Sequence, residues 1–299
     1  MELTQKFVRK QLELLRPLYN ASDLDKSRKG QDAIGKLMQV AHRREVAFAP
    51  EAFPDFAACW AIPKEPAESA GCALYLHGGG YVCGDLTYAK GVGGALAAET
   101  GLQVLCPAYR LAPEHPFPAA LEDAGVCYRR LLERGFDPAR IVLAGESAGG
   151  GLIYSLCLWL KEQNLPLPGG LIALSPWTDL TCTGESYAKN RERDPSMTIE
   201  ELRFYAESYT DNPQNPYVSP LFGALSGLPE SLLLVGGDEI MRSDTEMLYE
   251  KLLAAGCKAR LIVGDGLWHA YVLYGLKERR GDLEAMVSFA REVALCPKN

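Results

Sequence analysis

The chain has 299 residues, 47% of them hydrophobic and 23% charged, and a formal net charge of −7. This composition is typical of a soluble globular protein, because no apolar run is long enough to cross a bilayer and the start of the chain has no signal-peptide segment. The negative charge, without Lys and Arg clustered among aromatic residues, argues against a nucleic-acid partner. Nine cysteines without CxxC or metal-ligand spacing suit a reducing compartment, so we expect a cytoplasmic protein with no disulfide and no metal.

Residues 1–44 are predicted to be helical. One apolar stripe consists of Phe7, Val8, Leu14, Leu15 and Leu18 and is closed by Pro17 and Asn20, and a second begins at Ile34 and continues through Leu37, Met38 and Ala41. Nothing in this part of the chain carries chemistry, so we interpret it as a cap.

An alternation of strands and helices follows the first 44 residues. Strands are predicted at 45–49, 56–62, 72–76, 103–107, 141–144, 171–174, 232–235 and 260–263, with helices at 86–100, 121–132, 148–160, 244–255 and 282–295. The first two strands suit an antiparallel edge, and the rest have the crossover lengths of parallel strands. The expected fold is an α/β-hydrolase fold with an eight-stranded, mostly parallel sheet flanked by helices and covered by a helical cap.

Residues 178–218 interrupt this alternation. A capping box at Thr198 and Glu201 precedes a predicted helix over 202–209, which we interpret as an insertion that packs with the N-terminal helices as a lid. The cap is therefore 1–44 and 178–218, and the core is 45–177 and 219–299. Aromatic residues in or beside the insertion are candidates for an acyl pocket or for plain cap core: Trp177, Phe204, Tyr205 and Tyr209.

The motif Gly-Glu-Ser-Ala-Gly at 145–149 lies between a predicted strand and a predicted helix. A GxSxG pattern alone is weak evidence, but a sharp turn from strand to helix is the setting that lifts a serine hydroxyl clear of a sheet. Gly184-Glu185-Ser186 repeats the first letters of the motif without a preceding strand. The context therefore makes Ser147, and not Ser186, the candidate nucleophile.

The motif His77-Gly78-Gly79-Gly80 directly follows the strand predicted at 72–76. Acyl transfer needs backbone N–H groups aimed at an oxyanion, and residues without side chains let the backbone approach a substrate closely. A plain glycine-rich turn or a phosphate loop is the alternative, but no Lys-Ser or Lys-Thr follows as a phosphate loop requires. We expect Gly79, Gly80 and Ala148 to donate to the oxyanion and His77 to shape the loop.

A nucleophilic serine needs a base and a carboxylate that orients the base, in the chain order Ser, Asp or Glu, His. Of the histidines at 42, 77, 115 and 269, only His269 follows Ser147, just after the last predicted strand. The candidate acids between the two are Asp238, Glu239, Asp244 and Asp265. We choose Asp238 because it follows a strand and a Gly-Gly turn; Asp244 is expected to be an exposed acid at a helix N-terminus and Asp265 a turn residue.

With these residues in place, the chain resembles the hormone-sensitive lipase family of α/β-hydrolase esterases. The likeness covers nearly the whole chain, through HGGG at 77–80, YRLAPEHPFPAALED at 109–123, GESAG at 145–149, SPLF at 219–222 and the acid and base segments. The acid segment GGDEIMRSD departs from the DPLRDE of many members, and Ala270-Tyr271 replaces the small apolar residue and Phe that usually follow the histidine.

The resemblance implies the same oxyanion donors, the same Ser147, Asp238 and His269 triad, and a helical cap. It also implies a serine carboxylesterase that hydrolyses short- to medium-chain acyl esters without a cofactor, and it allows a homodimer. Two other functions stay open at this point. One is a ligand-binding receptor without turnover, which would typically lack His269; the other is the same triad acting on amides, lactones or formamides.

Overall fold

The fold is built on one mixed sheet in the computed structural model, which describes residues 4–15, 23–68 and 71–295. The eight strands of this sheet in the described ranges are β1 Val46–Ala52, β2 Ala57–Pro63, β3 Cys72–Leu76, β4 Gln103–Ala108, β5 Ile141–Glu146, β6 Gly170–Leu174, β7 Glu230–Gly236 and β8 Ala259–Gly264. Their order is β1-β2-β4-β3-β5-β6-β7-β8, and β2 is antiparallel to both of its neighbours while all other pairs are parallel. The predicted α/β-hydrolase architecture is confirmed, including the antiparallel edge.

The α-helices alternate with these strands as predicted. They are α1 Gln5–Leu15, α2 Leu24–His42, α3 Leu86–Thr100, α4 Ala119–Glu133, α5 Ala148–Glu162, α6 Glu185–Lys189, α7 Ile199–Tyr209, α8 Arg242–Ala254 and α9 Arg280–Leu295. Helix α2 begins earlier than its apolar stripe, because the Asp23 side chain accepts from the Lys26 N–H and caps it. The short helix α6 was not predicted. Leu18 and the predicted stop at Pro17 and Asn20 lie outside the described residues.

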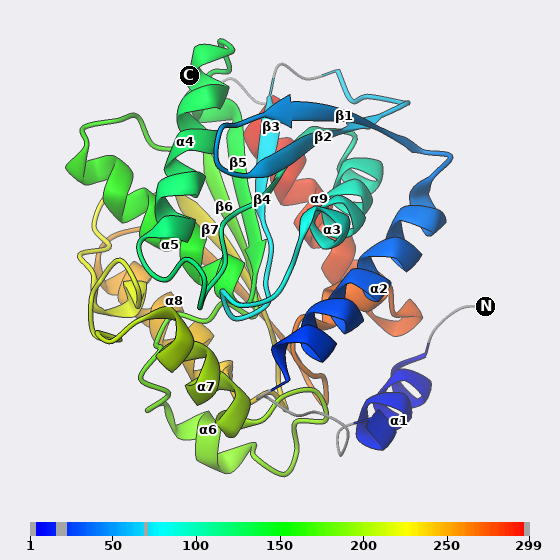
Figure 1. The fold of residues 1–299 in the computed structure, drawn as a ribbon, viewed down its shortest axis with the longest axis vertical. Coiled ribbons are helices and arrows are strands. Elements are labelled where there is room, and N and C mark those ends of the chain that lie inside the picture. Colours follow the sequence, from blue (N-terminus) through cyan, green and yellow to red (C-terminus); the bar gives the residue numbers. More distant parts are fainter. Residues whose placement is uncertain (1–3, 16–22, 69–70, 296–299) are drawn as a thin grey trace.

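Two helical layers cover the two faces of the sheet, α3 and α9 on one and α4, α5 and α8 on the other (Figure 1). Because side chains alternate along a strand, each parallel strand contributes to both layers. In β3, Ala73 and Tyr75 belong to the cluster under α3 and α9, whereas Leu74 and Leu76 belong to the cluster under α4 and α5. The continuous apolar runs seen in the sequence follow from this burial on both faces.

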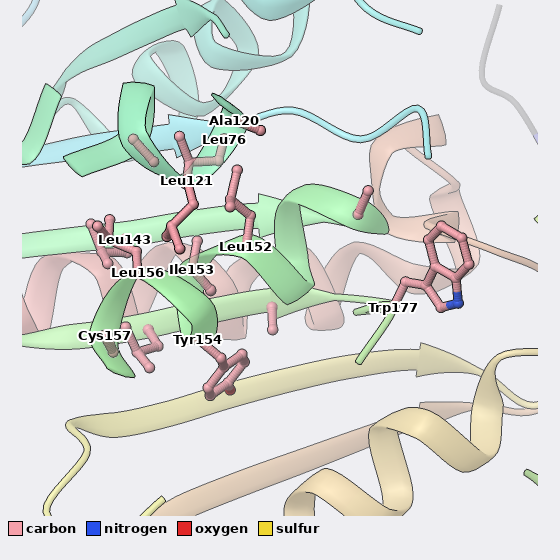
Figure 2. Packing of buried hydrophobic residues seen from close by; sticks show 14 of the residues in the cluster. Leu76, Ala120, Leu121, Leu143, Leu152, Ile153, Tyr154, Leu156, Cys157 and Trp177 are labelled. Carbon is pink, nitrogen blue, oxygen red and sulfur yellow. The ribbon is translucent and has the colours of Figure 1, made fainter. Parts of the chain in front are cut away.

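Helix α5 is buried along most of its length, and Figure 2 shows the side chains that surround it. Its residues Leu152, Ile153 and Leu156 are fully buried among Leu143 of β5 and Leu121 of α4. Burial of one such side chain contributes about 1.5–3 kcal/mol relative to leaving it exposed. The first turn of α5, which follows Ser147, is therefore held by a rigid core.

The helices α1, α2, α6 and α7 gather beyond one end of the sheet (Figure 1). That end is the carboxyl edge of the parallel strands, because Gln31 of α2 and Tyr205 of α7 reach the loop after β3 and Arg9 of α1 reaches the turn after β7. Helix α2 crosses α3 closely at Gly35, where an added Cβ would lie 2.5 Å from the Cα of Tyr88. Helices α1, α2 and α7 therefore contact the loops that carry the predicted site.

The eight cysteines that the structure describes are all buried with free thiols: Cys59, Cys72, Cys83, Cys106, Cys127, Cys157, Cys182 and Cys257. Burial raises the pKa of thiols such as Cys72, Cys127 and Cys157, so these groups serve as small core hydrophobes. Across 4–15, 23–68 and 71–295, no helix combines the length and the apolar character that crossing a bilayer requires.

Candidate active site

Ser147 occupies a strained turn between β5 and α5. Its backbone has φ 56° and ψ −125°, an unusual combination for a residue that is not glycine. The turn is held by hydrogen bonds from Ser147 N–H to the Leu174 carbonyl at 2.9 Å and from Gly151 and Trp177 N–H groups to the Ser147 carbonyl at 3.0 and 2.9 Å. This is the geometry of a nucleophile elbow, in which a strained backbone presents the serine hydroxyl above the sheet.

The glycines of the motif are required by backbone packing. A Cβ on Gly149 would lie 2.0 Å from the Leu76 carbonyl oxygen, and one on Gly145 would lie 2.4 Å from the Gly149 carbonyl oxygen. Neither neighbour is a side chain that can move aside. The turn can therefore form only where both positions lack a side chain, as the sequence pattern predicted.

The glycine loop after β3 lies against the nucleophile. The Cβ position of Gly78 is 3.0 Å from the Cβ of Ser147, and both Gly79 and Gly80 have positive φ, 119° and 62°. The N–H groups of Val82 and Cys83 both donate to the Gly79 carbonyl, at 3.0 and 2.9 Å. The structure thus brings the HGGG loop and the GESAG turn together, with Ala148 at the N-terminus of α5 beside them.

His77 shapes this loop from beneath. It is fully buried, its Nδ1 lies 2.8 Å from the Gly78 carbonyl, and its ring stacks on Tyr109 with centroids 4.1 Å apart. Burial lowers the pKa of His77 to about 4, so the ring is neutral at physiological pH. These contacts agree with a loop-shaping role and leave His269 as the candidate base.

Glu146 links the two loops, and the sequence analysis did not single it out. The Gly78 N–H donates to its Oε1 at 2.7 Å, and the hydroxyls of Tyr75 and Tyr88 donate to the same carboxylate at 2.7 and 3.0 Å. Burial raises the pKa of Glu146 to about 7, although these hydrogen bonds oppose the shift. A charged residue at the end of an otherwise apolar buried strand was the available signal.

The carboxylate that faces His269 is Glu239. The His269 Nδ1 lies 3.4 Å from the Glu239 Oε2, a separation typical of a catalytic pair without bound substrate. Glu239 is fully buried and accepts a hydrogen bond of 2.8 Å from the Ser175 hydroxyl. Burial raises the pKa of Glu239, whereas His269 and Ser175 lower it. Ser175 also accepts from the Ala270 N–H at 2.9 Å, so one hydroxyl joins the acid to the loop that carries the base.

Asp238, the acid chosen from the sequence, lies elsewhere. Its carboxylate forms ion pairs with Arg9 at 2.8 Å and with Arg193 at 2.5 Å, both from the cap. The two neighbouring residues of the turn after β7 make contacts in different directions, and Glu239 has the longer side chain and the more deeply buried position. The structure therefore brings Glu239 to His269, and not Asp238 as the sequence led us to expect.

Two further acids were weighed from the sequence. Asp244 is fully buried and not exposed as predicted, because its carboxylate accepts from the backbone N–H groups of Thr178 and Asp179 at 3.1 and 2.9 Å. Burial raises the pKa of Asp244 well above its usual value. Asp265 lies in a turn, as predicted. Neither is brought to His269 by any contact described above.

The four aromatic candidates for an acyl pocket separate into two pairs. Trp177 and Tyr209 are buried, and Tyr209 stacks on Tyr81 with centroids 3.9 Å apart, so this pair belongs to the core under the cap. Phe204 and Tyr205 on α7 are only half buried. The Tyr205 ring covers the oxyanion loop, since a Cβ on Gly80 would lie 2.4 Å from its Cδ2.

The described residues include no group of three or more His, Cys, Asp or Glu side chains arranged to hold a metal ion. The groups that the site brings together are a strained serine, a histidine next to a buried carboxylate, and a loop of glycine N–H groups.

A family model described as the alpha/beta hydrolase fold matches residues 73–273. The chain therefore belongs to the α/β-hydrolase family.

Comparison with individual proteins gives a narrower class. The chain is 38% identical over 238 residues to an acetyl-hydrolase of Streptomyces hygroscopicus, which covers 78% of this chain and 80% of the relative. It is similar to a solved hormone-sensitive lipase from a metagenome library, with a TM-score of 0.87 and 30% identity over 97% of this chain and 98% of that one. The crystal structure of EstE5 soaked with ethyl alcohol matches with a TM-score of 0.87 and 33% identity over 96% and 98% of the two chains. Within its family, the chain is a carboxylic ester hydrolase of the hormone-sensitive lipase group.

Proposed function

We propose that the chain is a serine esterase that uses a Ser147, His269 and Glu239 triad and hydrolyses short- to medium-chain acyl esters. The observation that carries this proposal is the meeting of the strained Ser147 turn with the glycine loop, where the Gly78 Cβ position lies 3.0 Å from the Ser147 Cβ. A serine whose hydroxyl is presented beside backbone donors suits attack on a carbonyl carbon.

The first half of the reaction is acylation. His269 accepts the hydroxyl proton as the Ser147 oxygen attacks the ester carbonyl, and Glu239 holds the imidazole in the tautomer that can accept it. The tetrahedral oxyanion is stabilised by N–H groups of Gly79, Gly80 and Ala148, each contributing about 10²–10³ in rate. The C–O bond to the alcohol then breaks, and the leaving oxygen takes the proton from His269.

The second half is deacylation. His269 removes a proton from water, the resulting hydroxide attacks the acyl carbon, and collapse of the second tetrahedral intermediate releases the carboxylic acid. Ser147 regains its proton from His269, so the enzyme returns to its starting state. Every proton moves through His269, and the catalytic groups of this scheme are three side chains and the backbone N–H groups of the oxyanion site.

We assign residues 1–44 and 178–218 to a cap that encloses the acyl chain. Tyr205 supports this assignment because its ring lies against Gly80, one of the residues proposed to bind the oxyanion. An acyl pocket bounded by an aromatic ring this close to the oxyanion site favours short acyl chains. The acetyl-hydrolase relative is consistent with the short end of that range.

The free thiols of the described chain support the expectation of a cytoplasmic location.

The test is initial-rate hydrolysis of p-nitrophenyl esters from acetyl to lauroyl. Wild type is expected to be most active on short chains, and Ser147→Ala is expected to lose at least about 10⁴-fold in kcat. Ser288→Ala, an exposed serine on α9, is the matched control and should keep full activity. Binding of the esters without turnover by wild type would favour a receptor, and faster cleavage of matched anilides would favour an amidase.

A further inference from the structure

Asp238 is a meeting point for two segments of the cap. Arg9 of α1 and Arg193, from the loop between α6 and α7, donate to different oxygens of its carboxylate, and the Asp238 side chain is only 8% exposed. The two arginines come from the two separate segments of the proposed cap, 1–44 and 178–218. Asp238 itself belongs to the core turn that carries Glu239.

Arg9 also contacts the loop that carries the base. The Nη1 that reaches Asp238 donates to the Gly266 carbonyl at 2.9 Å as well, and Nη2 donates to the Arg193 carbonyl at 2.7 Å. Gln5, one turn earlier in α1, donates to the same Gly266 carbonyl at 3.0 Å. One helix thus binds the acid turn, the base loop and the second cap segment together.

The acid turn and the base loop are themselves joined by backbone hydrogen bonds. Asp238 N–H donates to the Leu267 carbonyl at 2.9 Å, and Gly237 N–H donates to the Gly264 carbonyl at 2.8 Å. A shift of one segment against the other would therefore strain these hydrogen bonds and change the separation of Glu239 and His269. The contact between these two side chains, at 3.4 Å, leaves little room for such a shift.

The cap segment 190–196 binds the acid turn from its other side. The Asn190 amide donates to the Gly237 and Glu239 carbonyls at 3.2 and 2.9 Å, and Asp194 accepts from the Ile240 N–H at 2.9 Å. The Ser196 hydroxyl accepts from the His269 N–H at 3.4 Å. Cap side chains therefore bind the backbone of both the acid and the base.

We propose that Asp238 is a positioning residue: its ion pairs with Arg9 and Arg193 dock the cap onto the acid turn and the base loop, and this docking sets the distance between Glu239 and His269. The inference rests on the proposed function, because it assigns these two side chains to the acid and the base. A misplacement of catalytic groups by about 1 Å can cost about 10²-fold in rate.

This role differs from a stabilising one. The Asp238 carboxylate is buried, but the Arg193 side chain is 60% exposed and that of Arg9 is 27% exposed, so solvent screens both ion pairs and reduces their contribution to global stability. Losing an ion pair should therefore reduce kcat while the melting temperature stays close to that of wild type. If α1 only lined the acyl pocket, its loss would instead raise KM and change the preference for acyl length.

The experiment uses the full chain with Arg9→Ala, Arg9→Lys, Asp238→Asn and the Arg9→Ala, Asp238→Asn double variant. Each single removal is expected to lower kcat on p-nitrophenyl butyrate about tenfold with KM changed less than twofold, and the double variant to be no slower than the slower single one. Arg9→Lys should recover part of the loss, since it keeps the charge but not the forked donors. Lys189→Ala, which removes an exposed ion pair within α6, is the control and should match wild type.

Amide hydrogen exchange at 236–241 and 264–270 tests whether the ion pairs hold these two segments, independently of any esterase activity. Exchange in both segments should be faster in Arg9→Ala and Asp238→Asn than in wild type and Lys189→Ala, whether or not the protein turns over an ester. Unchanged exchange with unchanged kcat would overturn the positioning role. A change confined to KM, or additive losses in the double variant, would overturn it as well.

Discussion

The two halves of the site are built in different ways. The nucleophile half, Ser147 with the glycine loop, is held mainly by its backbone. The Ser147 dihedral angles are strained, and neighbouring atoms lie only 2.0–3.0 Å from where a Cβ on the glycines would be. The buried Glu146 carboxylate also binds the glycine loop. The acid–base half, Glu239 with His269, is held by side chains, including Ser175 from the core and Arg9, Asn190 and Arg193 from the cap.

The difference shows what each half depends on. The first half depends mainly on the core fold, because strands β3, β5 and β6 and helix α5 supply the backbone contacts that hold the Ser147 turn. The second half depends on contacts between segments more than 200 residues apart in the chain, such as Arg9 and Asp238. Apart from Ser147 itself, variants of the residues that hold the first half should therefore affect mainly stability, and variants of those that hold the second half mainly catalysis.

The sharpest test concerns the choice between two adjacent carboxylates. Glu239→Gln should lower kcat about 10³–10⁴-fold, because the amide no longer stabilises the imidazolium and can favour the wrong tautomer. Asp238→Asn should cost only about tenfold, as a positioning residue does. Kinetics on p-nitrophenyl butyrate decide the matter, and equal losses in the two variants would contradict the assignment of Glu239.

In the nucleophile half, Gly149→Ala should destabilise the fold by about 3 kcal/mol, because its Cβ would lie 2.0 Å from the Leu76 carbonyl oxygen and backbone must move. Gly30→Ala is the matched control: nothing lies within 4 Å of its Cβ position in α2, so alanine should stabilise by up to about 1 kcal/mol. Guanidinium unfolding measures both. A Gly149→Ala variant as stable as wild type would show that the turn is not packed as described.

Glu146 gives the nucleophile half a pH dependence. Burial raises the folded-state pKa to about 7 from an ordinary value of 4.5, so the folded protein keeps a proton that the unfolded chain loses between these pH values. The unfolding free energy should therefore fall as pH rises from 4.5 to 7, by on the order of 3 kcal/mol from this group, and change no further above that.

His77 acts in the opposite sense over an overlapping window. Its pKa is lowered to about 4 by burial, so it destabilises the fold as pH falls below its ordinary value of 6.5. The Glu146 contribution is therefore measured as the difference between wild type and Glu146→Gln in urea unfolding at pH 5 and 7.5. A difference that is the same at both pH values would show that Glu146 does not titrate in this range.

The smallest expected effect is that of Ser175→Ala. The variant removes the donor to Glu239 and the acceptor of the Ala270 N–H, so kcat should fall about tenfold while the unfolding free energy changes little more than for one lost hydrogen bond. Ser288→Ala provides the reference. A loss of stability without a loss of kcat would show that Ser175 serves the fold and not the acid–base pair. That result would contradict the division of the site into two halves.

The extent to which sequence could predict the site follows the same division. Ser147, the glycine loop and all eight strands were predictable, because elbow and oxyanion geometry demands particular residues at fixed spacing along a short stretch of chain. Glu239 was not, since both members of the pair Asp238 and Glu239 follow β7 and either could orient a histidine. The choice depends on which of them the distant Arg9 and Arg193 neutralise, and no local pattern records that contact.

Other errors have the same origin. Asp244 was expected at the surface because acids commonly begin helices, yet the backbone of 178–179 folds back onto it and supplies two donors. Helix α2 began before its apolar stripe because a single capping aspartate set its start. In each case a contact made by one side chain outweighed the pattern of the surrounding sequence.

The buried thiols can report how often each part of the protein opens locally. A thiol reagent added to the native protein can react only when a segment opens, so its rate at each cysteine reports how often that segment exposes its interior. Cys72 and Cys106 lie in strands β3 and β4, whereas Cys182 lies in the cap insertion, so one labelling time course with peptide mapping ranks the two regions. Early reaction at Cys182 would mean that the segment between β6 and α6 opens while the sheet stays closed.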